Sequence, residues 1–127
     1  MSYPRELRYS EDHEWVRVEG DVVAVGVTDH AQGQLGDIVY VELPELGEEV
    51  AAGDTVCEVE SVKAVSDIIA PVSGKIVEVN EVLEDTGELM NSAPYGEGWI
   101  FKLELTDATE LDGLMDAAAY QSLVEEG

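Results

Sequence analysis

One lysine stands where a covalent group could be attached. Lys63 lies in a short break between two runs rich in β-branched residues, 55–60 and 65–69, and glycine and proline bound the two runs. This pattern predicts a hairpin over residues 55–69 with Lys63 at its tip. A tip holds the amine in water, open to an approaching enzyme. The alternative is a solubilising lysine at a turn, which is a common role there.

Three other residues could carry chemistry, and each has a simpler role. Cys57 lies inside a strand-like run with no glycine elbow or helix start to activate its thiol, so we expect it to fill the core. His13 and His30 are seventeen positions apart and lack the close spacing of paired metal ligands, which makes a zinc site a weak hypothesis. The residue pattern predicts neither a catalytic constellation nor a phosphate-binding loop.

Strand patterns dominate the chain up to about residue 105. Besides the hairpin, alternating or continuous apolar runs predict strands over 7–10, 14–18, 22–27, 38–43, 75–80 and 99–105. The first three would form a meander, and the continuous run 22–27 predicts burial on both faces. In two later strands, alternation predicts inward faces formed by Val39, Val41 and Leu43, and by Val77 and Val79.

Helical signals occur at two main places. Thr28 or Asp29 can cap a short helix that Gly36 closes, and a loop over 86–98 has room for one helical turn. From Thr106 onward the apolar spacing becomes helical, which predicts a C-terminal helical segment at about 107–125. We expect its apolar stripe to pack on the sheet; the stripe comprises Leu111, Leu114, Met115, Ala118, Ser122 and Leu123.

Length and composition predict a single domain over residues 1–127 with an extreme negative charge. The 29 acidic and 6 basic residues give a formal net charge of −23, which argues against nucleic acid and anionic membrane as partners. A hydrophobic content of 45% is too high for a disordered chain. We hypothesise a cytosol of high salt, because self-repulsion is relieved when the screening length falls to about 3 Å near 1 M salt.

The location of the protein is also predicted from composition. No apolar stretch approaches the length needed to span a bilayer, and the first residues lack the core of a signal peptide and the basic character of a transit peptide. A single cysteine fits a reducing compartment. We therefore expect the cytoplasm of a prokaryote.

The residues around Lys63 resemble the attachment hairpin of lipoyl and biotinyl carriers, and specifically the H protein of the glycine cleavage system. The resemblance rests on Glu60, Ser61, Val62, Lys63 and Ala64 and on segments 13–15, 26–32, 35–44, 70–80 and 94–99. In order and spacing it covers most of the chain, from about Leu7 to Leu123. Biotin carriers place methionine on both sides of the lysine, and lipoyl domains of 2-oxo acid dehydrogenases commonly have aspartate before it. Neither family has the surrounding segments.

The resemblance implies both a fold and a function. The fold is a mostly β barrel-sandwich hybrid of two antiparallel sheets, lipoyl-domain-like, with a short internal helix and a C-terminal helix. Lipoic acid would be joined to Lys63 as an amide by a lipoate ligase or lipoyl synthase system. The arm would carry the aminomethyl group of glycine from glycine dehydrogenase (decarboxylating) to a tetrahydrofolate-dependent aminomethyltransferase. Dihydrolipoamide dehydrogenase would reoxidise it.

Under this resemblance the chain is a non-catalytic carrier, expected to be a monomer, with a groove for the loaded arm. A cationic aminomethyl group favours carboxylates, so Glu14 and Asp67 are the predicted groove acids, and Leu35 and Ala64 could supply apolar wall. The alternative for both acids is an exposed surface position. The lipoylating enzyme would recognise the hairpin together with nearby acids such as Glu60 and Asp67.

Two other functions are compatible with the sequence. One is a relay that donates lipoyl groups to other lipoate-dependent complexes, which could coexist with glycine cleavage. The other is an unmodified interaction module that keeps the fold without the cycle. The intact neighbourhood of Lys63 disfavours the unmodified module, whereas the sequence does not separate the relay from the carrier.

Overall fold

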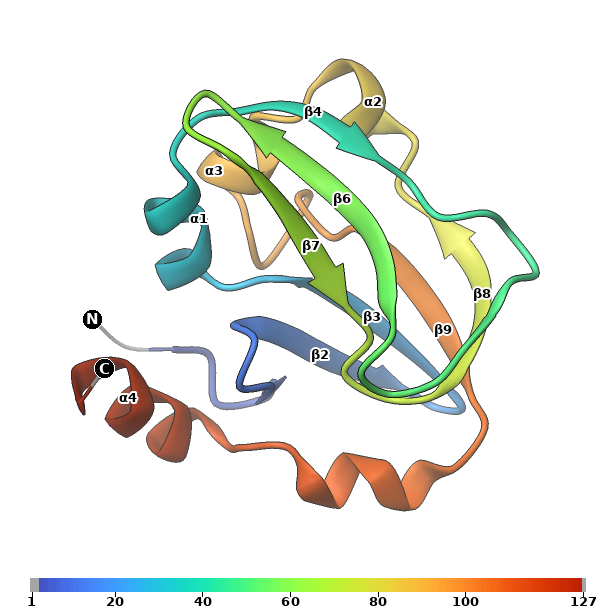
Figure 1. Ribbon diagram of the computed structural model, residues 1–127. Helices are drawn as coiled ribbons and strands as arrows, with labels where there is room; N and C mark the ends of the chain where they lie inside the picture. Colours follow the sequence, from blue (N-terminus) through green and yellow to red (C-terminus); the bar gives the residue numbers. More distant parts are fainter. Residues whose placement is uncertain (1–2, 127) are drawn as a thin grey trace.

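The computed structural model describes residues 3–126, which form two antiparallel sheets (Figure 1). The larger sheet contains, in spatial order, β1 (Arg8–Tyr9), β2 (Glu14–Glu19), β3 (Val22–Val27), β9 (Phe101–Leu105), β8 (Gly74–Val79) and β5 (Glu49–Val50). The smaller sheet contains β4 (Ile38–Glu42), β6 (Thr55–Ser61) and β7 (Val65–Ile69). The prediction of a mostly β fold with two antiparallel sheets is confirmed.

Short helices lie at the ends and edges of the sheets. They are α1 (Asp29–Leu35), α2 (Val82–Asp85), α3 (Leu89–Ser92), the 3₁₀ helix η1 (Ala108–Gly113) and α4 (Ala117–Glu126). As predicted, Thr28 caps α1, since its side chain accepts a hydrogen bond from the Ala31 N–H at 3.2 Å, and Gly36 ends the helix. Among the described residues, no helix has both the length and the apolar character that crossing a bilayer requires.

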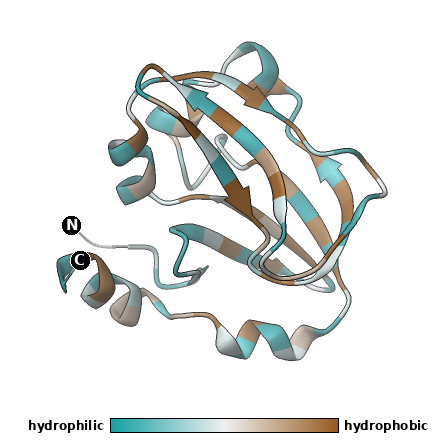
Figure 2. Cartoon of the chain, viewed as in Figure 1, coloured by the Kyte–Doolittle hydropathy of each residue, from teal (hydrophilic) through white to brown (hydrophobic). Residues whose placement is uncertain are grey.

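The main core lies between the two sheets. Strand β3 contributes a nearly continuous buried run, as its apolar sequence predicted, and Figure 2 shows brown and teal alternating along β6, as expected of a strand with one face in the core. Cys57 is in this core as a free, buried thiol, and burial raises its pKa to about 12. A thiol in that environment stays protonated, so the predicted core role is confirmed.

Two β-bulges change the predicted inward faces. Val39 is 57% exposed and Val77 is 40% exposed, so the prediction that these valines face the core is wrong. The register of β4 shifts between Ile38 and Tyr40, and β8 has a similar irregularity just after Ile76. An extra residue at a bulge turns the following side chains to the other face, and the isoleucines take the core positions instead.

The C-terminal segment closes a second cluster of buried side chains. In α4 the buried residues are Ala117 and Tyr120, whose ring stacks on Tyr9 with the ring centroids 4.7 Å apart. The predicted stripe is wrong at Ala118 and Ser122, which are exposed. The reason is a break in the helix: η1 ends before Leu114, and α4 begins with a new phase. The predicted C-terminal helix itself is confirmed.

Candidate functional site

Lys63 lies on the exposed turn between β6 and β7, and a buried serine fixes this turn. The Ser61 side-chain oxygen accepts hydrogen bonds from the backbone N–H groups of Lys63 and Ala64, each at 3.2 Å. The Ser61 hydroxyl and backbone N–H both donate to the Ala64 carbonyl, at 3.2 and 2.8 Å. Because the serine is only 6% exposed, water does not compete strongly for these bonds. The turn is therefore a fixed support for the lysine.

The residues flanking Lys63 leave it accessible from outside. Val62 and Ala64 are both exposed, and the Val62 N–H donates to the Asp37 carbonyl at 3.0 Å, which ties the tip to the loop before β4. Glu60 is exposed on the outer face of the smaller sheet, where it pairs with Tyr40 on one side and Val65 on the other. An enzyme that acts on the lysine amine would meet this face of the sheet.

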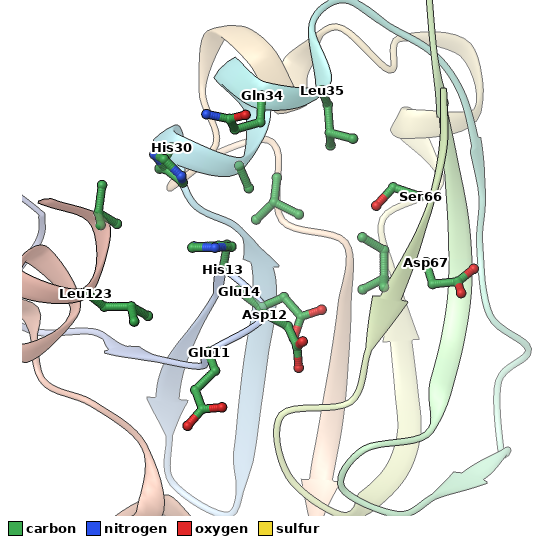
Figure 3. Close-up of a pocket in the computed structure, with 14 residues that line it drawn as sticks. Glu11, Asp12, His13, Glu14, His30, Gln34, Leu35, Ser66, Asp67 and Leu123 are labelled. Carbon is green, nitrogen blue, oxygen red and sulfur yellow. The ribbon is translucent and has the colours of Figure 1, made fainter. Parts of the chain in front are cut away.

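A cavity of about 650 Å³ lies between α1, β7, the start of β2 and α4 (Figure 3). Its apolar wall comprises Val27, Ala31, Leu35, Ile68, Leu123 and Val124. Its charged and titratable groups are Glu11, Asp12, His13, Glu14, His30 and Asp67. The cavity therefore combines an apolar wall with an acidic rim and suits a ligand that has a carbon chain and a cationic end.

Glu14 lies at the base of this cavity and is 1% exposed. One carboxyl oxygen accepts the Ile69 N–H at 2.7 Å, and the other accepts the Ser10 hydroxyl at 3.2 Å. Burial raises its pKa to about 8, although the bond from Ile69 opposes the shift. The carboxyl is thus largely protonated at neutral pH, and a cation placed beside it would favour ionisation. The bond to Ile69 also links β2 of the larger sheet to β7 of the smaller one.

Of the other three predicted groove residues, Leu35 and Asp67 line the cavity, in different orientations. The prediction for Ala64 is wrong, because it is exposed on the hairpin turn and does not line the cavity. Figure 3 shows Leu35 pointing into the cavity from the end of α1. The Asp67 carboxylate points away from Glu14, while the hydroxyl of the adjacent Ser66 points inward. Strand alternation explains the difference, because successive side chains of β7 face opposite sides. The structure therefore gathers Glu14, Leu35 and Ser66, and places Asp67 at the rim with its carboxylate outward.

Sequence reasoning did not assign the two histidines to this cavity. The His13 and His30 ring centroids are 4.8 Å apart, and the His13 Nδ1 is 2.8 Å from the Tyr120 hydroxyl, which also lies 2.7 Å from the Thr28 hydroxyl. Burial, and then the neighbouring His30, lower the pKa of His13. The backbone of His13 has a positive φ of 67°, which is uncommon for a residue other than glycine. This angle marks His13 as unusual in the structure, but it is not visible in the sequence. Within residues 3–126, no three histidine, cysteine or acidic side chains form a metal-binding group.

A β sandwich that presents an exposed lysine on a fixed hairpin, beside a cavity with an apolar wall and an acidic rim, has the features of a carrier domain for a covalent arm. A family model described as glycine cleavage H-protein matches residues 7–127 of the chain. The chain belongs to the glycine cleavage H-protein family.

Individual relatives agree with this assignment over nearly the whole chain. The chain is 57% identical over 124 residues to the glycine cleavage system H protein of Alteromonas mediterranea, and the match covers 97% of this chain and 96% of that one. It is 55% identical over 127 residues to the H protein of a Geobacillus species, covering 100% of both. The crystal structure of a glycine cleavage system H protein from Mycobacterium marinum superposes with a TM-score of 0.86 at 41% identity, covering 94% of this chain and 97% of that one.

These comparisons confirm the predicted fold and function. The likeness to the M. marinum structure confirms the lipoyl-domain-like arrangement of two antiparallel sheets with short helices and a C-terminal helix. Membership of the family makes the chain the lipoyl carrier of the glycine cleavage system, a subunit that shuttles the aminomethyl group without catalysing a reaction.

Proposed function

We propose that Lys63 is the lysine that carries the lipoyl arm, with Glu60, Ser61, Val62 and Ala64 as its attachment motif. The observation that carries this proposal is the turn itself, in which a buried serine fixes an exposed lysine at the tip of a hairpin. The other two lysines of the chain lie within strands β8 and β9, and the amine of Lys102 is paired with Glu19 at 3.0 Å.

The cavity beside the hairpin is proposed to hold the end of the arm. A lipoyl group supplies a dithiolane, whose disulfide is reduced when the aminomethyl group is taken up. Leu35 offers an apolar surface to the carbon chain, and Glu14 offers a carboxyl that can give up its proton and hold a cation. Asp67 adds negative charge at the rim. The cavity walls would shield the side of the arm that lies against them from water.

The proposed partners differ in what they must contact. The enzyme that joins lipoate to Lys63, whether a lipoate ligase or a lipoyl synthase system, has to reach the amine itself, so it must meet the tip and Glu60. Glycine dehydrogenase (decarboxylating), aminomethyltransferase and dihydrolipoamide dehydrogenase act at the far end of the arm. Once any of these enzymes docks, the tether keeps the reactive end of the arm at a high effective concentration near its active site.

Further parts of the proposal concern the molecule as a whole. We propose a monomer with one carrier domain over residues 1–127, of which residues 1, 2 and 127 lie outside the described range, working in the cytoplasm of a salt-adapted prokaryote. A net charge of −23 supports the salt adaptation and disfavours binding to nucleic acid or anionic membrane.

The test is the intact mass of the protein isolated from its own host, with peptide mapping around Lys63. We expect a lipoyl increment on Lys63, absent from Lys63→Arg and retained in the matched control Lys75→Arg. An increment that maps to another lysine, or a biotin increment, would overturn the assignment. An unmodified Lys63 in cells that lipoylate their other carriers would instead indicate an interaction module.

A further inference from the structure

The loop that connects α1 to β4 is held in place by one side chain of α3. The Asn91 amide nitrogen donates to the Gly36 carbonyl at 2.8 Å and to the Gln32 side-chain oxygen at 3.0 Å. The Asn91 oxygen accepts the Ile38 N–H at 3.0 Å. Both ends of the asparagine amide are therefore used, and they fix the backbone on both sides of Asp37.

The hairpin tip rests on this loop. In addition to the bond between the Val62 N–H and the Asp37 carbonyl, the side chain of Lys63 lies against Gly36. A Cβ atom on Gly36 would lie 3.2 Å from the Lys63 Cε, 3.5 Å from its Cδ and 3.7 Å from its Nζ. The lysine stem therefore occupies the side of the glycine that any other residue would fill. The tip is exposed, as the sequence predicted, but its lysine stem has a contact surface.

The backbone of Gly36 imposes the same requirement. Its φ of 80° and ψ of −160° lie in a region that is nearly exclusive to glycine. The residue before it, Leu35, lines the cavity. The Lys63 stem therefore lies against the residue that follows a cavity-lining leucine, and this contact limits the directions in which an arm can leave the hairpin.

We propose that Gly36 and Asn91 are positioning residues for the attachment lysine. Asn91 fixes the loop, and Gly36 leaves an open surface on which the stem of Lys63 lies, so that the arm starts beside Leu35. The inference rests on the proposed attachment at Lys63. Its physical benefit is that a stem held in one direction loses less rotamer freedom when the end of the arm enters the cavity.

The first experiment measures the lysine stem in the unmodified protein by NMR. With ¹³C-labelled lysine the chain gives only three Cε signals, from Lys63, Lys75 and Lys102. We expect the Cε of Lys63 to be more ordered than that of the exposed Lys75. In Gly36→Ala the order of Lys63 should fall to the level of Lys75. Equal mobility of the two lysines in the unchanged protein would overturn the inference, whether or not any variant folds.

Gly20→Ala is the matched control. Gly20 also has a positive φ, 73°, but a Cβ there would meet no atom within 4 Å, so it tests backbone strain without touching the lysine. We expect Gly20→Ala to leave the order of Lys63 unchanged. Asn91→Ala, which adds no clash, should reduce it partly. Similar loss of order at Lys63 in Gly20→Ala would show that the effect is general and would contradict a local role.

The second experiment uses the lipoylated protein. Chemical shifts of cavity residues such as His13 and Leu35 report how much of the protein has the end of its arm in the cavity. We expect the ratio of protein with the arm in the cavity to protein with the arm free to be about two- to tenfold lower in Gly36→Ala. If the lipoyl increment is absent from Lys63 in the unchanged protein, the proposed function fails, while the NMR result on the unmodified stem stands separately. If lipoylation is normal and the ratio is the same in Gly36→Ala, only the positioning role fails.

Discussion

Replacing Glu14 by glutamine should remove a large pH dependence from the stability of the fold. Burial raises the pKa of Glu14 from 4.5 to about 8. Between these values the folded protein keeps a proton that the unfolded chain has released, so the free energy of unfolding falls as pH rises. Below the window both states are protonated, and above it both are ionised. The stability contributed by the protonated carboxyl is therefore lost only between about pH 4.5 and 8.

The size of this effect follows from the pKa shift. Each pKa unit corresponds to about 1.4 kcal/mol, so the penalty for Glu14 reaches about 3 kcal/mol at pH 7 and nearly 5 kcal/mol above pH 8, as upper estimates. Glutamine has the same shape and does not ionise. Its oxygen can still accept the Ile69 N–H, and its amide can donate to Ser10, so the local packing is kept.

Urea unfolding at constant ionic strength measures the difference between the two proteins. From pH 5 to pH 7 we expect the free energy of unfolding of Glu14→Gln to gain about 2–3 kcal/mol relative to the unchanged protein, because all other titrating groups cancel in the comparison. Glu11→Gln, an exposed acid on the same cavity, is the matched control and should show no such gain. A difference for Glu14→Gln that stays constant across this range would refute the reasoning.

Three further predictions concern the turn, the C-terminal helix and the charge. Ser61→Ala should lower the free energy of unfolding by about 1–3 kcal/mol, because two turn amides lose a buried acceptor; an unchanged urea midpoint would contradict this role. Tyr120→Phe should lower the free energy of unfolding by about 1–2 kcal/mol, because it removes the hydroxyl that lies between His13 and Thr28. Calorimetry should show a lower Tm, and an unchanged Tm would contradict this role of the hydroxyl. The Tm should rise from 0.1 to 2 M potassium chloride, and a flat or falling curve would reject salt adaptation.

The sequence predicted those features that short-range patterns determine. The hairpin around Lys63 follows from β-branched runs between turn residues, and the buried strand 22–27 follows from a continuous apolar run. The limits of α1 follow from Thr28 and Gly36, whose capping roles depend on the immediate backbone. Each of these signals acts within a few residues, so one chain is sufficient to find it.

Features that depend on distant contacts were not predicted. The bulges that turn Val39 and Val77 outward arise from pairing with another strand, and the phase of α4 depends on where η1 stops. The same limit applies to the cavity. His13 and His30 meet because β2 and β3 pair antiparallel, which sets Glu14 opposite Val27. The resemblance included both histidine segments but gave no reason to place the rings together.

Glu14 connects the cavity with the hairpin, and this dual position decides which variants are informative. Its carboxyl accepts the Ile69 N–H of β7, the strand that leads away from Lys63, so the residue proposed to hold the cation also supports the hairpin. Glu14→Ala would remove both properties and could not separate them. Glu14→Gln keeps an acceptor for Ile69 and abolishes only the ability to ionise beside a cation. A loss of cation retention in the glutamine variant, with the order of Lys63 unchanged, would therefore assign the charge itself to the function.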